Sequence, residues 1–483
     1  MRKFIAAIVL LFCTGSVVFG QHTILENYKW AFGYNCGVDF ISGSPVAFRT
    51  NITTNEGSAS VSDASGGLLF YTDGRRVWDR TNTVMASGGS LVSFATTSTS
   101  QGSLIIPVIG NPNQYYLFSL EDYSGAGRLY YCIIDMTLSG GFGDVVSGTI
   151  GTLLVSAIGE RMCAVQGNNC DIWLVTHKKG NNNFYCYDIT AAGIGSPVVS
   201  TVGSFTSTAA YNIGQLRASP DRQKLGSTSY GGGSYSASTV GTELFDFDPS
   251  TGIVSNNITL DSLNCPYGIE FSPDNTKLYV CPTGFSGGGG GGAQLFQFDL
   301  SAGSATAIRA SRTTINSVSS ACYPTLKLGP DNKIYMGSMT GTTSTFLDCI
   351  TSPNTAGTGC GFSSRAVTLL SSTTSYFGLP NLFVTVGSGD TTTFRRDTVA
   401  CIPTTSGTIT IGTAITGTGY TWNDGVTTQT RTITAFGTYW VAIVNGCHID
   451  IDTIVVTRQT PTFTNRIHDT AECALRFPIT LSV

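Results

Sequence analysis

Three segments of the sequence share one pattern of strand and turn: Ala218-Ser219-Pro220-Asp221, Phe271-Ser272-Pro273-Asp274 and Leu328-Gly329-Pro330-Asp331. Their aspartates lie 53 and 57 residues apart. Proline presets φ at the first central position of a type I turn, and aspartate accepts backbone hydrogen bonds there. We therefore expect Asp221, Asp274 and Asp331 to form turns rather than to bind calcium, which needs several clustered oxygen ligands. A repeat of this length predicts the blades of an all-β protein, a β-propeller.

Looser copies of the pattern precede these segments. They lie at residues 62–67, 111–114 and 167–171, and a hydrophobic strand follows each of them. The regular region runs from about residue 28 to residue 386. At both of its ends, residues remain that belong to none of the six copies. A seventh blade assembled from both ends would use these residues and close the ring, which removes exposed sheet edges. We therefore favour seven blades and keep six as the alternative.

The composition agrees with many short strands and tight turns. Only 12% of the 483 residues are charged, 58 are glycine, and no long stretch shows the period of an amphipathic helix. The formal net charge is −4, and the basic residues are scattered along the chain. We expect no nucleic-acid partner, because nucleic-acid-binding proteins concentrate lysine and arginine on one surface.

Residues 1–20 have the parts of a secretory signal peptide. Arg2 and Lys3 supply positive charge, an apolar run follows, and Gly20 is a small residue at the cleavage point. Cleavage after Gly20 predicts a secreted or outer cell-surface protein. No later segment reaches the roughly 18 apolar residues of a transmembrane helix, so we expect no membrane span.

The 14 cysteines favour disulfides, since exported proteins fold in an oxidising environment. Three local pairs are predicted: Cys163 with Cys170, Cys349 with Cys360, and Cys401 with Cys447. The alternative is that several of these cysteines are buried thiols. No Cys-x-x-Cys pair is present and the four histidines lie far apart, so we expect no metal site and no cofactor.

After the propeller, assigned to residues 21–388, the composition changes to a linker and a small all-β module. We assign residues 389–459 to an immunoglobulin-like β-sandwich, with Trp422 in its core and Tyr439 as the candidate for a tyrosine corner. The segment Asp397-Thr398-Val399-Ala400-Cys401 recurs as Asp469-Thr470-Ala471-Glu472-Cys473. Residues 460–483 are therefore expected to begin a second, truncated module.

Several segments resemble secreted β-propeller proteins of the Bacteroidetes: Trp30-Ala31-Phe32-Gly33-Tyr34-Asn35-Cys36-Gly37-Val38-Asp39-Phe40, Leu68-Leu69-Phe70-Tyr71-Thr72-Asp73-Gly74 and Asp171-Ile172-Trp173-Leu174-Val175-Thr176-His177-Lys178. The segment Tyr420-Thr421-Trp422-Asn423-Asp424-Gly425 is similar to the immunoglobulin or PKD-like repeats of those proteins. The resemblance implies a C-terminal sorting domain associated with type IX secretion and gliding motility, which this sequence lacks. It implies no catalytic residues, because none are generally assigned in that family.

Residues at the start of each innermost strand line the central opening of a propeller. Their spacing from the turns, or their place near the same loops, identifies six candidate binding residues: Glu56, Gln101, Glu160, Arg161, His177 and Gln215. A ring of such groups can bind a sugar or an ion. The alternative is that these side chains hydrogen-bond the backbone of neighbouring blades.

The sequence carries no recognisable reactive constellation. It lacks the Gly-x-Ser-x-Gly motif of serine hydrolases and the aspartate boxes of sialidases, which argues against an enzyme. We expect an exported binding or adhesion protein whose propeller recognises a surface glycan or a protein, with the immunoglobulin-like modules as spacers. Two alternatives stay open. One is a carbohydrate-active enzyme with Glu56 and Glu160 as a carboxylate pair in the channel, and the other is a structural component of the surface or motility apparatus.

Overall fold

The computed structural model describes residues 21–458, apart from short gaps. The gaps are residues 94–96, 205–211, 231–240, 262–265, 283–291, 293, 319–324, 338–342, 387–390, 401–407, 418 and 446–447. The chain falls into two compact units, the first of which ends at Val386. None of the helices in the described ranges has the length and apolar character needed to cross a membrane.

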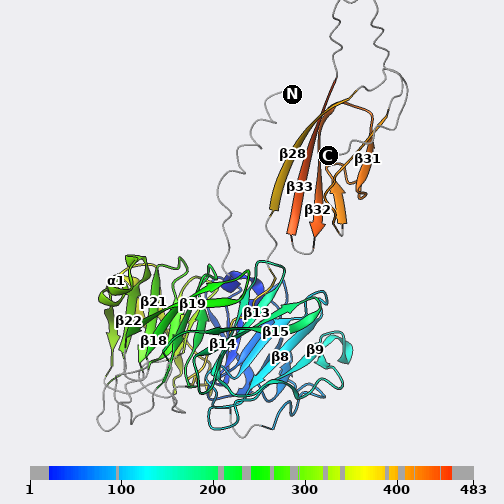
Figure 1. Cartoon of the computed structure of the whole chain (residues 1–483). Helices are drawn as coiled ribbons and strands as arrows, with labels where there is room; N and C mark the ends of the chain where they lie inside the picture. Colours follow the sequence, from blue (N-terminus) through cyan, green and yellow to red (C-terminus); the bar gives the residue numbers. More distant parts are fainter. Residues whose placement is uncertain are drawn as a thin grey trace, which may run out of the picture. The chain divides into compact units, whose positions relative to one another are not determined.

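Within the described residues, the first unit forms seven antiparallel sheets that follow one another along the chain (Figure 1). Two sheets have three strands: β1 (Lys29–Phe32), β2 (Tyr34–Asp39) and β3 (Val46–Thr53), then β4 (Ala59–Ser62), β5 (Leu68–Thr72) and β6 (Val77–Asp79). The third has five: β7 (Ser103–Pro107), β8 (Gln114–Leu120), β9 (Leu129–Asp135), β10 (Asp144–Val145) and β11 (Thr152–Val155).

The other four sheets have four strands each. They are β12 (Ile158–Gln166), β13 (Ile172–Lys178), β14 (Asn183–Thr190) and β15 (Gly193–Thr201); β16 (Leu216–Ala218), β17 (Lys224–Thr228), β18 (Thr242–Asp248) and β19 (Ile253–Asp261); β20 (Pro266–Phe271), β21 (Lys277–Pro282), β22 (Gln294–Asp299) and β23 (Thr313–Ser317); and β24 (Leu326–Leu328), β25 (Ile334–Gly337), β26 (Phe346–Ile350) and β27 (Phe362–Thr368). The prediction of a β-propeller is confirmed, with the favoured number of blades.

Short helical turns connect or precede the strands. They are the 3₁₀ turns η2 (Gln21–Thr23), η3 (Leu25–Asn27), η4 (Ser139–Gly141), η6 (Leu300–Ala302) and η7 (Gly357–Cys360), and the helix α1 (Ala305–Ala310). Only η2 and η3 bear on the site described below, because they lie at the start of the described chain.

The ring closes where its first and last sheets meet. Trp30 of β1 packs edge-on against Tyr335 of β25, with ring centroids 5.7 Å apart, inside one buried apolar cluster. Burying large side chains of this kind contributes about 1.5–3 kcal/mol each. Closure differs from the expectation in one respect, because the first blade consists of N-terminal strands alone. The C-terminal segment adds isolated bridges instead of a strand: Thr374 pairs with Tyr34 of the first blade, Asn381 with Ala59 of the second, and Ser375 with Ser344 beside β26 of the last. Pro380 lies in this segment and has no N–H for a ladder.

The Pro-Asp segments form the predicted turns between the first two strands of three blades. Asp221 accepts a hydrogen bond from the Gln223 backbone N–H at 3.1 Å, and Asp274 accepts one from the Thr276 N–H at 3.0 Å. The third turn is one residue shorter, and its Asp331 carboxylate instead accepts from the Lys333 ammonium at 2.9 Å. All three aspartates therefore serve the turns, as expected.

Two predicted disulfides are wrong. Cys163, Cys349 and Cys360 are free, buried thiols, whereas Cys170 is disulfide-bonded. Cys163 lies within β12, and a strand rises about 3.3 Å per residue, so Cys170 beyond the strand's end is too far away for a bond that needs Cα atoms within about 7 Å. Cys349 and Cys360 belong to different apolar clusters, which face different neighbouring sheets. The third pair, Cys401 with Cys447, lies outside the described residues.

The second unit is a β-sandwich. One sheet has the order β28 (Thr391–Ala400), β33 (His448–Arg458), β32 (Gly437–Asn445) and β30 (Gly419–Trp422), and the other pairs β29 (Ile409–Gly412) with β31 (Thr430–Ile433). Trp422 is buried in the apolar cluster between the sheets, as predicted. The Tyr439 hydroxyl donates to the Ala435 carbonyl at 2.7 Å, which is the contact of a tyrosine corner.

Candidate functional site

The first strands of successive blades lie next to one another around the propeller axis. All six candidate residues occur in or beside the inner strands and are buried, with exposed fractions between 0% and 8%: Glu56, Gln101, Glu160, Arg161, His177 and Gln215. Burial of so many polar groups requires hydrogen-bond partners. Their partners divide the six residues into three groups.

Gln101 and Gln215 connect blades. The Gln101 side-chain oxygen accepts from the backbone N–H groups of Met162 at 3.2 Å and Leu216 at 2.8 Å, and its amide donates to the Leu216 carbonyl at 3.1 Å. The Gln215 amide donates to the Thr325 hydroxyl at 2.7 Å. Both residues therefore form hydrogen bonds to other blades. This agrees with the alternative that the candidate side chains hold blades together and do not bind a ligand.

Arg161 and His177 form a second group. The guanidinium donates to the hydroxyls of Ser227 at 2.8 Å and Ser229 at 2.9 Å and lies 3.0 Å from His177 Nδ1. Burial, followed by the charge of Arg161, lowers the pKa of His177 well below its usual range. His177 is therefore neutral at physiological pH. Its Nδ1 also lies 2.9 Å from the Lys178 carbonyl, so the tautomer decides whether this nitrogen accepts from Arg161 or donates to Lys178.

Glu56 and Glu160 form the third group, a pair of interacting carboxyl groups. Burial raises the pKa of Glu160 to about 7, and burial together with the charge of Glu160 raises the pKa of Glu56 well above its usual range. Glu160 accepts hydrogen bonds from the Ser100 N–H, the Ser100 hydroxyl and the Tyr123 N–H, each at 2.8 Å. Glu56 interacts with the Ser98 hydroxyl at 3.2 Å. Both carboxyl groups therefore hold a proton more readily than a free glutamate side chain does.

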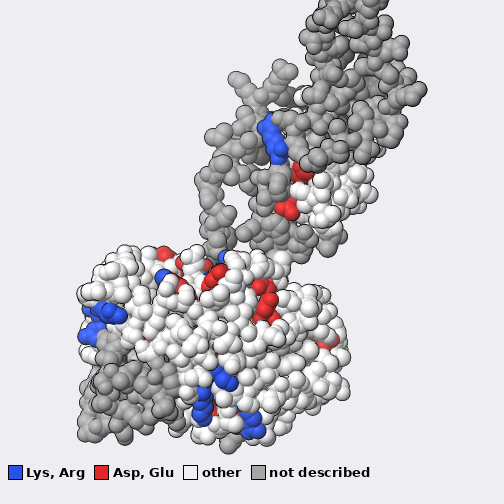
Figure 2. Space-filling model, viewed as in Figure 1, with Lys and Arg blue, Asp and Glu red and all other residues white. Residues whose placement is uncertain are grey.

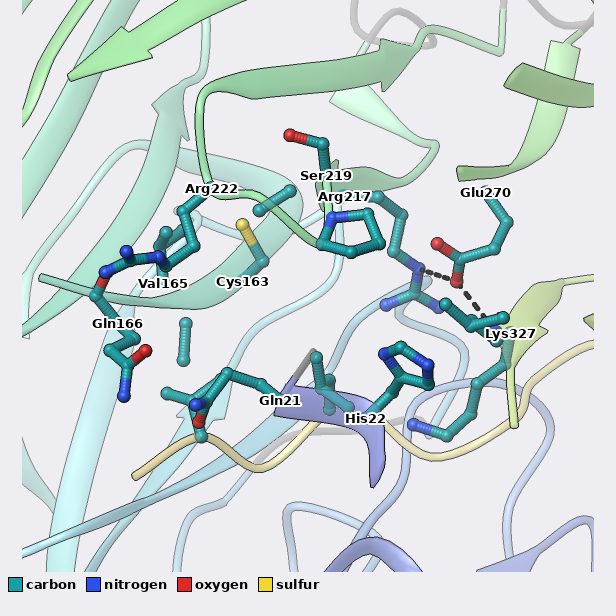
Figure 3. Close-up of a pocket in the computed structure, with 16 residues that line it drawn as sticks. Gln21, His22, Cys163, Val165, Gln166, Arg217, Ser219, Arg222, Glu270 and Lys327 are labelled. Atoms are coloured by element: carbon teal, nitrogen blue, oxygen red, sulfur yellow. Dashed lines mark hydrogen bonds and ion pairs between the residues drawn. The ribbon is translucent and has the colours of Figure 1, made fainter. Parts of the chain in front are cut away.

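A second site, which the sequence analysis missed, lies at the end of the inner strands that carries the Pro-Asp turns. A cavity of about 50 Å³ opens between β12, β16, β20 and β24. Figure 3 shows Cys163 between two groups, with Gln166 and Arg222 on one side and Arg217, Glu270 and Lys327 on the other. A water molecule needs about 10–15 Å³ on this measure, so the cavity has room for a few waters or a small ion and not for a sugar.

Charged side chains from three adjacent blades meet in this cavity. The Glu270 carboxylate accepts from the backbone N–H groups of Phe271 and Leu328, both at 3.0 Å, and lies 3.7 Å from Arg217 Nε. Lys327 is 3% exposed and its ammonium lies 5.1 Å from the centre of the Trp30 ring. Burial, and then the charge of Arg217, lower the pKa of Lys327 to about 7.

The chain's own segments cover the mouth of this cavity. Gln21 of η2 accepts a hydrogen bond from the Thr385 N–H at 2.8 Å. The Asn27 side chain both accepts from the Phe383 N–H, at 3.1 Å, and donates to the Phe383 carbonyl, at 2.8 Å. His22 reaches Asn332 of the third Pro-Asp turn at 2.9 Å.

One signal in the sequence could have revealed this cluster. Arg217, Glu270 and Lys327 each stand three residues before the proline of their turn. A charged residue that recurs at one position of a buried strand predicts a charged cluster on the axis, because propeller repeats are related by rotation about it.

The surface view shows few charged residues on the propeller. They form small, separate groups on a mostly uncharged face, in agreement with the low charge content of the sequence (Figure 2).

Comparisons with known proteins add distant structural similarities. No protein-family description and no curated protein matches the sequence. A 6-phosphogluconolactonase-like protein from Bacteroides fragilis is 9% identical, with a TM-score of 0.42 over 76% of this chain and 99% of that chain. A similar protein from Bacteroides uniformis is 11% identical, with a TM-score of 0.30 over 61% and 92% of the two chains. Puromycin hydrolase is 10% identical, with a TM-score of 0.35 over 70% and 54%. It is the sheet arrangement, rather than these values, that identifies the fold.

Proposed function

We propose that this chain is an exported binding protein of the cell surface or the surrounding medium, in which the propeller holds a glycan or a protein and the sandwich acts as a spacer. The resemblance of its motifs to secreted Bacteroidetes propellers supports export. The signal-peptide pattern of residues 1–20 supports it independently.

The observation that carries the binding proposal is the hydrogen bonding of the Glu56 side chain. Its carboxyl group is buried and, within the described residues, has a single hydrogen-bond partner, the Ser98 hydroxyl, and burial raises its pKa well above the usual range. A buried carboxyl group with spare hydrogen-bonding capacity can both donate to and accept from a sugar hydroxyl. Glu160 is committed to Ser100 and Tyr123 and would position the site. The cavity at the opposite end of the strands is too small for a sugar, so we assign the proposed binding to the Glu56 end.

The same pair of carboxyl groups favours a second candidate function, glycoside hydrolysis. That reaction uses one protonated and one ionised carboxyl group. Glu56 would act as the acid, and Glu160, with a pKa of about 7, would supply the partner carboxylate.

Two variants of Glu56 separate the candidates. In a glycan-array and calorimetry screen of the full chain, Glu56→Ala should weaken binding by about tenfold or more, because it removes a buried hydrogen-bonding group. Glu56→Gln imitates the protonated carboxyl and should retain binding. If the protein is a hydrolase, both variants should lose release of reducing ends from the bound glycan. Glu26→Ala, in η3, is the matched control. Wild-type affinity in a folded Glu56→Ala variant would contradict the binding site.

A further inference from the structure

The cavity at the Pro-Asp end of the inner strands has an unbalanced charge. Around Lys327 its lining holds the cation Arg217, Lys327 itself when protonated, a single carboxylate, Glu270, and the neutral side chains His22 and Cys163; Arg222 also lines the cavity but donates to the carbonyls of Gln166 and Gly167. Burial holds the pKa of His22 below its usual value and raises the pKa of Cys163 to about 12, so neither of these groups contributes negative charge. Buried charges in proteins are normally paired, because an unpaired charge is costly in a medium of low dielectric constant.

Two donors in this cavity have unused capacity. Arg217 Nε has no hydrogen-bond partner among the described residues, since its distance of 3.7 Å to Glu270 is too long for one. The Lys327 ammonium, on a side chain that is almost fully buried, contacts the Trp30 ring and makes no hydrogen bond within the described part of the chain. Arg217's other nitrogens are used, by Asn381 at 3.0 Å and the Leu326 carbonyl at 3.2 Å.

We propose that this cavity binds a small monovalent anion, such as chloride, between Arg217 and Lys327. The size of the cavity favours an ion of this class over a phosphorylated metabolite or a sugar acid, because only about 50 Å³ is available. The anion would supply the negative charge that Glu270 alone does not, and would use donors contributed by neighbouring blades. Figure 3 shows the Lys327 side chain running past His22, so a bound anion would also lie close to the segment that covers the cavity.

The proposal predicts a pH dependence of anion binding. Lys327 faces Arg217 on β16, Glu270 on β20 and His22 on η2, and it titrates near pH 7. Because the protonated ammonium attracts an anion and the neutral amine does not, affinity should be highest below pH 7 and should fall as the pH rises above it. Protonation of His22 at lower pH adds positive charge and acts in the same direction.

The test is thermal unfolding of the full chain at constant ionic strength, with sodium gluconate replaced stepwise by sodium chloride or bromide. The unfolding midpoint of the wild type should rise with halide concentration, because an ion that binds the folded state stabilises it. Lys327→Met should weaken the apparent halide affinity by about tenfold or more, the loss expected for a charged hydrogen bond. Lys224→Met, which removes an exposed lysine outside the cavity, should leave the affinity unchanged. Equal halide responses in wild type and Lys327→Met would overturn the proposal.

A direct measurement covers the case in which Lys327→Met does not fold. Wild-type crystals soaked in sodium bromide should show an anomalous peak inside the cavity, within hydrogen-bonding reach of Arg217 and Lys327. An empty cavity in those crystals would refute the site. A peak that persists unchanged in a folded Lys327→Met variant would mark an adventitious ion only, and it would refute the site equally.

Discussion

At the scale of single residues, some buried polar side chains have hydrogen-bond partners for all their polar atoms, and others do not. Both carboxylate oxygens of Glu160 accept hydrogen bonds, and Gln101 uses both the oxygen and the nitrogen of its side-chain amide. Glu56, Arg217 and Lys327 keep unused capacity in the described residues. Unused capacity in a buried polar group is costly, so these positions are where a ligand or a proton has the greatest effect.

Replacing Arg217 should reveal the cost of an unpaired buried carboxylate. Arg217→Met removes the cation that acts most strongly on Glu270, leaving only the weaker effect of Lys327, and should lower the free energy of unfolding by about 3 kcal/mol. The exposed pair of Lys224 and Asp246, with side chains 40% and 41% exposed, is the control, and Lys224→Met should cost less than about 1 kcal/mol. Urea denaturation of both variants measures the difference. Similar losses would show that Glu270 does not depend on Arg217.

Glu56 should make the stability of the propeller depend on pH. Its pKa in the folded state lies well above the value of 4.5 for the free side chain. The stability contributed by the protonated form is therefore complete below pH 4.5 and is lost as the pH rises through the folded-state pKa. Glu56→Gln is neutral throughout, so its stability relative to the wild type should increase as the pH rises above 4.5. Denaturation of both proteins from pH 4 to pH 9 tests this, and a constant difference would contradict it.

At the scale of elements, each Pro-Asp turn also works as a connector between blades. The residue after the aspartate has a left-handed backbone, with φ of 67° at Arg222, 65° at Asn275 and 63° at Asn332. Each of these side chains then reaches a neighbouring segment. Asn275 accepts from the Asp221 N–H at 3.0 Å, Asn332 bonds His22 at 2.9 Å, and Arg222 donates to the Gly167 carbonyl at 3.3 Å.

Substitutions of Asn275 should separate the two roles of this position. Asn275→Gly keeps the left-handed backbone and loses the bond to Asp221, which should cost about 0.5–1.5 kcal/mol. Asn275→Ala loses the bond and also strains the backbone, which should cost about 1 kcal/mol more. Chemical denaturation of the two variants gives the difference directly. Equal stability of the two variants would mean that the left-handed backbone at position 275 does not add to the cost of replacing Asn275.

At the scale of the whole molecule, the ring is held by contacts between segments that are far apart in the sequence. Trp30 meets Tyr335 across the closing blades, and Asn27 binds both backbone groups of Phe383. Such closure leaves no free sheet edge between the first and last blades. It also places η2, through Gln21 and His22, at the charged cavity.

Removing the Asn27 side chain should loosen this closure. Asn27→Ala leaves the Phe383 N–H and carbonyl without partners in a buried position, which should lower the stability by about 2–4 kcal/mol. Asn51, which is exposed and donates to the Asn82 carbonyl at 2.8 Å, is the matched control, and Asn51→Ala should have an effect within about 0.5 kcal/mol. Calorimetry of the full chain compares the two variants. A small effect of Asn27→Ala would mean that the ring closes without this contact.

The sequence by itself determined the propeller, its turns and the sandwich, because these depend on local chemistry. Pro-Asp dipeptides dictate turns wherever they occur, alternating strands follow them, and Trp422 with Tyr439 identifies a sandwich core and corner. Four buried polar residues near the inner strands were also identified from their spacing to those turns, and Arg161 and His177 from their place near the same loops.

Only the tertiary structure decided which of these residues act together. Glu56 and Glu160 are far apart in sequence, and the effect of Glu160 on the pKa of Glu56 depends on how their two blades approach each other. Cys163 and Cys170 are close in sequence, and an intervening stretch of extended strand keeps them from pairing. The cavity formed by Arg217, Glu270 and Lys327 exists because rotation about one axis brings equivalent positions of three repeats together, and the spacing between repeats does not specify what they will enclose.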